Sequence, residues 1–209
     1  MKIAVVAANG KAGKLIVEEA VRRGMDVTAI VRGENKTVAP KTITKDLFDL
    51  TSEDLKGFEA VVDAFGNWTP DAIHLIPEAT VHMAKVLSGS DARLPVVGGA
   101  GSLYVNPEHT ETVVEVTPFP EAAMPVVNGH GKALEELRKF DDVNWTYVSP
   151  AGDFQADGER TGKYILGGEE LVLNSKGESK ISYADYAIAM VDEIESGKHI
   201  KERISVVSE

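Results

Sequence analysis

The first residues that could bind a ligand are the glycines of IAVVAANGKAGK, at residues 3–14. Gly10 and Gly13 follow an apolar run from Ile3 to Val6 and precede an amphipathic stretch from Lys14 to Arg23. A glycine turn between a buried strand and a helix brings backbone N–H groups and the positive end of the helix dipole to an anion such as a diphosphate. A turn whose glycines serve packing alone is the alternative, but the strand–turn–helix context favours dinucleotide binding. The predicted contacts of the diphosphate are Ala7, Asn9, Gly10, Lys11, Ala12 and Gly13.

Arg32 is the residue that bears on cofactor choice. It ends the second predicted strand, where an acidic residue would bind the ribose 2′-OH of NAD and an arginine can hold the 2′-phosphate of NADP. A planar guanidinium binds phosphate through two parallel hydrogen bonds. Glu34 could pair with Arg32 or accept a bond from a ribose hydroxyl. We therefore expect NADP, with NAD as the alternative.

The elements that position these residues alternate along the chain. Apolar runs predict strands at 3–6, 27–31, 41–45, 60–65, 94–97 and 145–148, and amphipathic stretches predict helices at 14–23, 69–87 and 131–140. Alternation at this spacing indicates right-handed βαβ units and a parallel sheet. We expect an α/β, Rossmann-like doubly wound sheet with strand order 3-2-1-4-5-6.

The last quarter of the chain departs from this alternation. Residues 163–166 and 170–173 flank Gly167 and Gly168, which predicts a β-hairpin or two short strands outside the main sheet. Ser182 and Asp185 begin a helix in the manner of a capping box, and residues 204–207 read as a final strand. We expect one domain, 1–209, in which residues 151–209 form a small C-terminal lid on the substrate side.

Composition excludes several classes of function. The net charge is −11, with 22 basic and 33 acidic residues, which argues against nucleic acid or an anionic membrane as the main partner. The chain has no cysteine, and its five histidines show no metal-ligand spacing, so we expect no metal site. A strand begins within two residues of Met1, which leaves no room for a signal peptide. We expect a soluble, cytoplasmic monomer or homodimer that acts on a small molecule.

Several segments together resemble one family. They are IAVVAANGKAG, VTAIVR, DLFDL, VVDAFG, VVGGAGSL, WTYVSPAGDF, GERTGKY and ISYADYAIAMVDEIE. The chain resembles the atypical short-chain dehydrogenase/reductases that bind NAD(P)H, and within them the NADH-flavin reductase branch, related to the flavin/biliverdin-IXβ reductases and the NmrA-like proteins. The glycine turn of that family usually reads G-A-T-G-x-x-G, so Ala7 replaces a glycine and Asn9 a threonine.

The resemblance implies roles for residues at the ends of other strands. Its adenine and ribose regions correspond to Asp46, Leu47, Ala64, Phe65 and Gly66, and its nicotinamide end to Gly99. These positions also lie where ligands bind an open parallel sheet, beyond the carboxyl ends of its strands. Ser102 loosely matches the serine that short-chain reductases place beside a substrate carbonyl.

The tyrosine–lysine pair of short-chain dehydrogenases is missing. In those enzymes Y-x-x-x-K lets a phenol protonate the carbonyl oxygen. The matching positions here are Val127 and Gly131, and neither can do acid–base work. His130 and Lys132 flank the lysine position, and we take His130, with Ser102, as a candidate catalytic residue.

This absence limits the chemistry. Hydride transfer to a flavin or quinone needs two stacked ring systems more than a proton donor, and the cofactor supplies the reactivity. We therefore expect an NAD(P)H-dependent reductase of flavin-like or quinone-like molecules. A non-catalytic NADP(H)-binding sensor of the NmrA-like type is the alternative, and a nucleotide-sugar epimerase is a weaker one.

Overall fold

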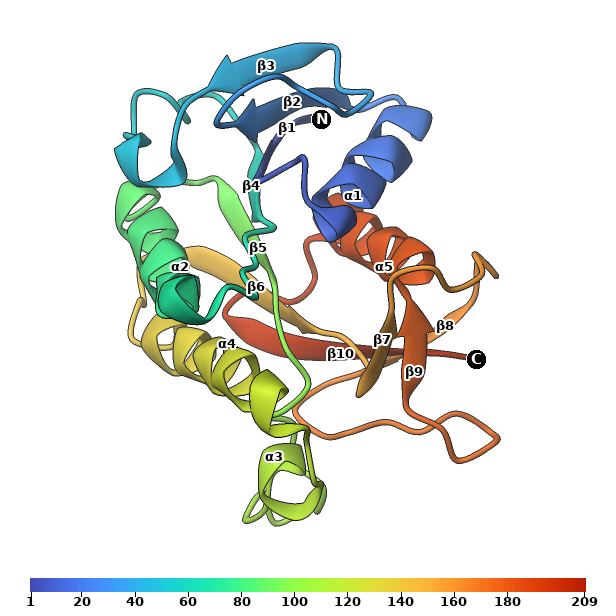
Figure 1. The fold of residues 1–209 in the computed structure, drawn as a ribbon. Helices are drawn as coiled ribbons and strands as arrows, with labels where there is room; N and C mark the ends of the chain where they lie inside the picture. The colour runs from blue at the N-terminus through green and yellow to red at the C-terminus, as the bar shows by residue number, and fades with distance from the viewer.

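An eight-stranded sheet forms the centre of the molecule (Figure 1), and the computed structural model describes all residues from 1 to 209. Its strand order is β3-β2-β1-β4-β5-β6-β10-β8, and only β8 is antiparallel to its neighbour. The strands are β1 (Lys2–Val6), β2 (Asp26–Val31), β3 (Lys41–Thr44), β4 (Ala60–Asp63), β5 (Arg93–Val97), β6 (Asn144–Ser149), β8 (Tyr164–Gly167) and β10 (Glu202–Ser208). The first six strands have the predicted order 3-2-1-4-5-6, so the α/β doubly wound fold is confirmed.

Helices cover both faces of the sheet (Figure 1). On one face α1 (Lys11–Arg22) packs against α5 (Tyr183–Ser196), and on the other α2 (Leu75–Val86) packs against α4 (Met124–Leu137). The shorter elements are α3 (Val113–Val116) and the 3₁₀ turns η1 (Leu47–Asp49), η2 (Pro70–Ala72) and η3 (Glu121–Ala123). Because both faces are covered, β1 and β4 are almost wholly buried, which explains their continuous apolar sequences.

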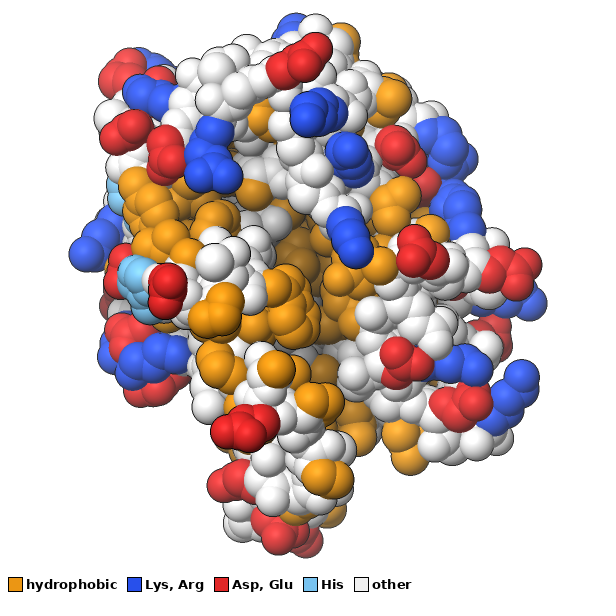
Figure 2. All heavy atoms as spheres, in the orientation of Figure 1, with side chains coloured by type: hydrophobic (Ala, Val, Ile, Leu, Met, Phe, Trp, Pro, Cys, Tyr) orange, Lys and Arg blue, Asp and Glu red, His pale blue; other side chains and the backbone are white.

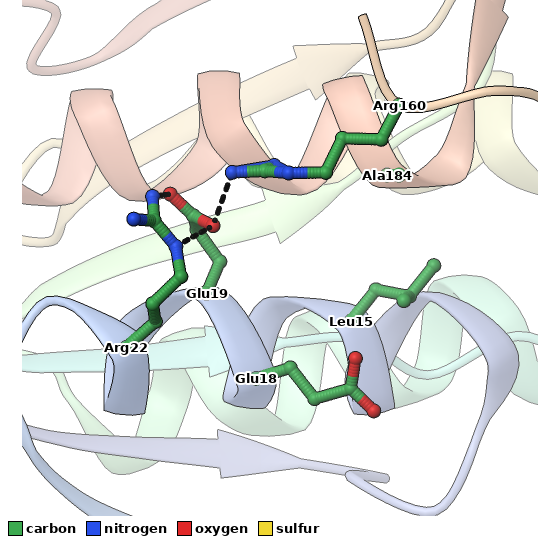
Figure 3. A pocket seen from close by; sticks show the side chains of 6 residues that line it. All are labelled: Leu15, Glu18, Glu19, Arg22, Arg160 and Ala184. Atoms are coloured by element: carbon green, nitrogen blue, oxygen red, sulfur yellow. Dashed lines mark hydrogen bonds and ion pairs between the residues drawn. The ribbon is translucent and has the colours of Figure 1, made fainter. Parts of the chain in front are cut away.

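An ion-pair network joins α1 to α5 through Arg23 and Asp192, and Figure 3 shows the part of it around Glu19. The buried carboxylate of Glu19 accepts hydrogen bonds from Arg22 (2.7 Å), Arg23 (2.8 Å) and Arg160 (3.1 Å). Arg23 also contacts Asp192 of α5 at 2.7 Å. The hydrogen bonds from Arg22 hold the pKa of Glu19 below its ordinary value. The small pocket beside Glu19 in Figure 3 is thus bordered by side chains that are already paired, and we assign it no ligand.

Three predicted helices begin elsewhere than expected. The helix α1 begins at Lys11, three residues before the predicted start at Lys14. The helix α4 begins at Met124, seven residues before the predicted start at Gly131. Pro125 stands in its first turn, where a proline needs no hydrogen bond, and the helix continues through Gly129 and Gly131. The predicted helix at 69–87 is divided into η2 and α2. Thr69 precedes η2 without a side-chain cap.

The predicted β-hairpin is wrong. β8 pairs with β10 at the edge of the main sheet, in the register Val207 with Ile165, and not with residues 170–173. Glu170 instead forms an isolated bridge with Tyr104. Pairing with β10 satisfies a longer row of backbone groups on an edge strand than a short isolated hairpin could.

A second, two-stranded sheet lies outside the main one (Figure 1). It pairs β7 (Asp153–Gln155) with β9 (Lys180–Ser182) in parallel and was not predicted. The predicted start of α5 is confirmed, since the Ser182 hydroxyl accepts from the Asp185 N–H at 3.0 Å. The Asp185 carboxylate does not complete a capping box, because it accepts hydrogen bonds from Thr161 and Gly162 instead.

Candidate cofactor site and substrate cleft

The carboxyl ends of five parallel strands meet at one edge of the sheet. Val6 of β1 lies in register with Ile30 of β2 and Asp63 of β4, and Asp63 with Val96 of β5. Val97 in turn pairs with Val148 of β6. The loops that follow these strands therefore open on the same side, where an open α/β sheet binds its ligands, and the strand order reverses between β1 and β4. Figure 2 shows a hollow in this face with hydrophobic side chains around it and Lys and Arg side chains above it.

The glycine turn has the geometry of an anion site. Gly10 precedes α1 without a side-chain cap, and the N–H groups of Lys11, Ala12 and Gly13 make no hydrogen bond within the protein. A Cβ at Gly13 would lie 2.7 Å from the Ala7 carbonyl oxygen, so the residue must be glycine for the helix to pack on the turn. The free N–H groups at the start of a helix fit a diphosphate.

Ala7 stands in a conformation that usually belongs to glycine. Its φ is 56°, in the left-handed region, and its carbonyl accepts a hydrogen bond from the Gly10 N–H at 3.0 Å. The family's usual glycine at this position is therefore explained by backbone conformation, and alanine keeps the turn at a conformational cost.

Asn9 uses its side chain within the protein. Its Nδ2 donates to the carbonyl oxygen of Glu34 at 2.8 Å, and its Oδ1 accepts from the Lys36 N–H at 2.8 Å. Only the backbone of Asn9 therefore remains for the predicted contact with a cofactor. Its side-chain amide holds the segment that follows β2.

Arg32 is exposed directly after β2, and its guanidinium makes no ion pair or hydrogen bond within the protein. Lys36 is likewise exposed and unpaired. A protein with a net charge of −11 thus leaves two cations free beside the glycine turn. This arrangement fits a ligand with a phosphate beyond its diphosphate.

Asp46 and Leu47 have structural contacts. The Asp46 carboxylate caps η1 by accepting from the Phe48 N–H at 2.9 Å, and Leu47 is buried in the core beneath α2. Only the backbone of Leu47 is left to face a ligand. At the end of β4, Ala64 is buried, Phe65 packs partly on the α2 and α4 core, and Gly66 is exposed with open space around it.

Asp63 is a site residue that the sequence reasoning missed. It is the last residue of β4, is 2% exposed, and accepts hydrogen bonds from the Phe65 N–H (3.1 Å) and the Thr80 hydroxyl (2.9 Å). No lysine or arginine pairs with it, and burial raises its pKa to about 6. A carboxylate inside the apolar run VVDAF was the signal that could have found it.

The loop after β5 meets α4 closely. A Cβ at Gly99 would lie 2.8 Å from the His130 Cβ, and a Cβ at Gly101 would overlap the Val127 side chain. Gly131 lies beside Ser102. The structure therefore brings Gly99, Ser102 and His130 together, with Val127 and Gly131 between them.

Neither the His130 imidazole nor the Tyr147 phenol can act as a general acid at neutral pH. Burial lowers the pKa of His130 to about 4, which leaves its imidazole neutral. The buried Tyr147 hydroxyl donates to the His130 carbonyl oxygen at 2.8 Å and accepts from the Gly99 N–H at 3.1 Å. Burial raises the pKa of Tyr147, so its proton stays in this bond.

Ser102 has a partner that was not foreseen. The Arg203 guanidinium, buried on β10, donates to the Ser102 hydroxyl at 2.8 Å and to the Glu169 carboxylate at 2.6 Å. Arg203 also lies over the Tyr104 ring, 5.8 Å from its centroid. This cluster of Ser102, Glu169 and Arg203 links the loop after β5 to β10. Its only signal in the sequence was the single arginine in the run ERISVV.

The comparisons with known proteins show the family of the chain. The NAD(P)H-binding family model matches residues 7–196, so the chain belongs to the NAD(P)H-binding family. It is 45% identical to the uncharacterised Bacillus subtilis protein YwnB, over all of this chain and 99% of that protein.

Two solved structures extend the comparison. A Streptococcus pneumoniae protein described as a putative NADH-flavin reductase is 54% identical, with a TM-score of 0.97 over 100% of both chains. A Bacteroides thetaiotaomicron protein described as a putative epimerase is 33% identical, with a TM-score of 0.83 over 99% of this chain and 96% of that one.

None of the helices in the present structure has the length and apolar character needed to cross a membrane.

Proposed function

We propose that the protein is an NAD(P)H-dependent reductase that passes hydride to a flavin-like or quinone-like acceptor without a tyrosine–lysine pair. The reduced nicotinamide, when bound, supplies the hydride. The observation that carries the proposal is the contact between α4 and the loop after β5, where Val127 and Gly131 occupy the positions of the missing acid. The hydrophobic hollow in the face shown in Figure 2 suits a planar acceptor.

The chain's own residues have limited roles in this scheme. The N–H groups that open α1 bind the diphosphate, and Arg32 holds a 2′-phosphate, which favours NADP over NAD. Gly99 lets the loop after β5 pack closely on His130 of α4, and the neutral His130 imidazole can donate a hydrogen bond to the reduced acceptor. The description of the Streptococcus relative as an NADH-flavin reductase supports the acceptor class.

Steady-state NADPH oxidation with a panel of free flavins and quinones tests the proposal. We expect turnover with at least one of these acceptors. Tight NADPH binding with no turnover on any acceptor would contradict the reductase and favour the NADP(H)-binding sensor.

The cofactor preference has its own test. The Arg32→Ala variant should weaken NADPH binding about tenfold or more and NADH binding hardly at all, because only NADPH carries the 2′-phosphate. The Arg32→Lys variant should be intermediate, since it keeps the charge and loses the bidentate geometry. Equal losses for the two cofactors, measured by titration, would show that Arg32 does not hold the phosphate.

A further inference from the structure

We propose that Asn9 is a positioning residue for the choice between NADPH and NADH: it fixes residues 33–36 on the glycine turn and thereby fixes Arg32. This inference rests on the proposed function of the site. In this proposal Asn9 does not contact the 2′-phosphate. It acts through Arg32.

The contacts are specific to an asparagine. The Asn9 amide donates to the Glu34 carbonyl oxygen and accepts from the Lys36 N–H, both at 2.8 Å. One side chain thus pairs with a carbonyl and an N–H on either side of Asn35. Serine or threonine in its place would carry a single, shorter polar group, and aspartate would lose the donor.

No other side chain of the turn binds this segment. The backbone of Ala8 reaches β2 itself, through a bond from its N–H to the Ile30 carbonyl oxygen at 3.4 Å. The rest of the loop is held internally by Asn35, which donates to Thr42 and accepts from Thr37. Asn35 therefore shapes the loop, whereas Asn9 docks it on the turn.

Arg32 lies between two fixed points of the backbone. Val31 before it is the last residue of β2, and Glu34 after it is held by Asn9. Because the guanidinium has no partner of its own, its position depends on this backbone. Release of residues 33–36 would leave the diphosphate contacts on α1 in place and would weaken only the contact with a 2′-phosphate.

A double-mutant cycle on cofactor binding tests the proposal. Dissociation constants for NADPH and NADH would be measured by fluorescence titration for the wild type, Asn9→Ala, Arg32→Ala and the double variant. We expect Asn9→Ala to weaken NADPH binding about tenfold and NADH binding less than about twofold. In the Arg32→Ala background the same change should weaken NADPH binding by less than about twofold, because the two residues act as one unit.

Two further variants keep the test decisive. Asn9→Asp retains the acceptor for Lys36 and should be intermediate for NADPH. Asn106→Ala is the matched control, since Asn106 also makes paired contacts across a surface turn, with Thr110 at 2.7 and 3.0 Å, and it should change neither constant.

Three outcomes separate the explanations. Equal weakening of both cofactors by Asn9→Ala, or independent effects that multiply in the double variant, would overturn the role of Asn9. Absence of NADPH binding to the wild type would instead contradict the proposed function on which that role rests. Loss of NADPH binding in Arg32→Ala alone, with Asn9→Ala unchanged, would support the function and refute this inference.

Discussion

Ala7 shows how one residue can carry a conformational cost at a binding site. Its left-handed φ of 56° costs an L-residue about 1–2 kcal/mol, whereas glycine adopts it freely and loses about 0.5–1 kcal/mol through the unfolded state. We therefore expect Ala7→Gly to stabilise the protein by about 0.5–1 kcal/mol in denaturant unfolding. Ala8→Gly is the control. Ala8 is fully buried with an ordinary φ, so loss of its methyl group should destabilise the protein. A destabilising Ala7→Gly would show that the turn differs from this description.

Asp63 gives a pH-dependent prediction at the same scale. Its pKa is raised from 3.8 to about 6 by burial, so its contribution to stability is fully present below pH 4 and is lost as pH rises through 6. Asp63→Asn removes this dependence and keeps an acceptor for the Phe65 N–H. The variant's stability relative to the wild type should therefore increase by up to about 3 kcal/mol between pH 4 and pH 8.

Unfolding of Asp63→Asn and the wild type in urea across this pH range measures the difference directly. Other titrating groups are shared by the two proteins and cancel in the comparison. A difference that stays constant with pH would mean that Asp63 is ionised at an ordinary pKa in the folded state.

Single residues were also the hardest to predict from sequence. Gly10, Gly13 and Arg32 are predicted site residues because their types and their places at strand ends carry a chemical meaning. Asp63 and Arg203 were missed because a polar residue in an apolar strand reveals neither its partner nor the face on which it lies. The side-chain bonds of Asn9 were missed for a similar reason, since its partners lie 25 and 27 residues away.

At the scale of elements, Glu19 makes the clearest prediction. It accepts hydrogen bonds from three arginines while it is 5% exposed, and one of them, Arg23, also bonds Asp192 of α5. Because Arg22 and Arg160 are exposed and Arg23 keeps Asp192, Glu19→Gln should lower the free energy of unfolding by about 1–2 kcal/mol. Glu18 precedes Glu19 on the same helix and is exposed, so Glu18→Gln should change the free energy of unfolding by less than about 0.5 kcal/mol. A similar loss of unfolding free energy in both variants would show that the ion-pair network around Glu19 does not stabilise the protein.

Strands were predicted better than helix starts and edge pairings. Buried parallel strands are continuous apolar runs, and βαβ connections leave few possible orders, which is why 3-2-1-4-5-6 was correct. The start of α4 was misplaced because Gly131 resembled a helix boundary, whereas α4 runs from Met124 through both Gly129 and Gly131. The pairing of β8 with β10 depends on contacts between distant segments, which no local pattern contains.

The whole molecule joins an acidic surface to a locally basic rim. With a net charge of −11, long-range steering disfavours an anionic cofactor, so in the proposed function we expect its affinity to come from the unpaired N–H groups of α1 and from Arg32 at close range. Figure 2 shows an apolar hollow below the Lys and Arg side chains of this face. An anionic cofactor beside the cations and a planar acceptor in the hollow would give the arrangement that the proposed hydride transfer requires.

The most direct test of the reductase is a single-turnover experiment without oxygen. The protein with bound NADPH would be mixed with free FMN, riboflavin or a quinone, and the absorbance of the nicotinamide and the acceptor followed together. We predict simultaneous loss of reduced nicotinamide and of oxidised acceptor in equal amounts, at a rate above that of the mixture without protein. Bound NADPH that stays reduced with every acceptor would contradict the reductase and leave a protein that binds the cofactor without turning it over.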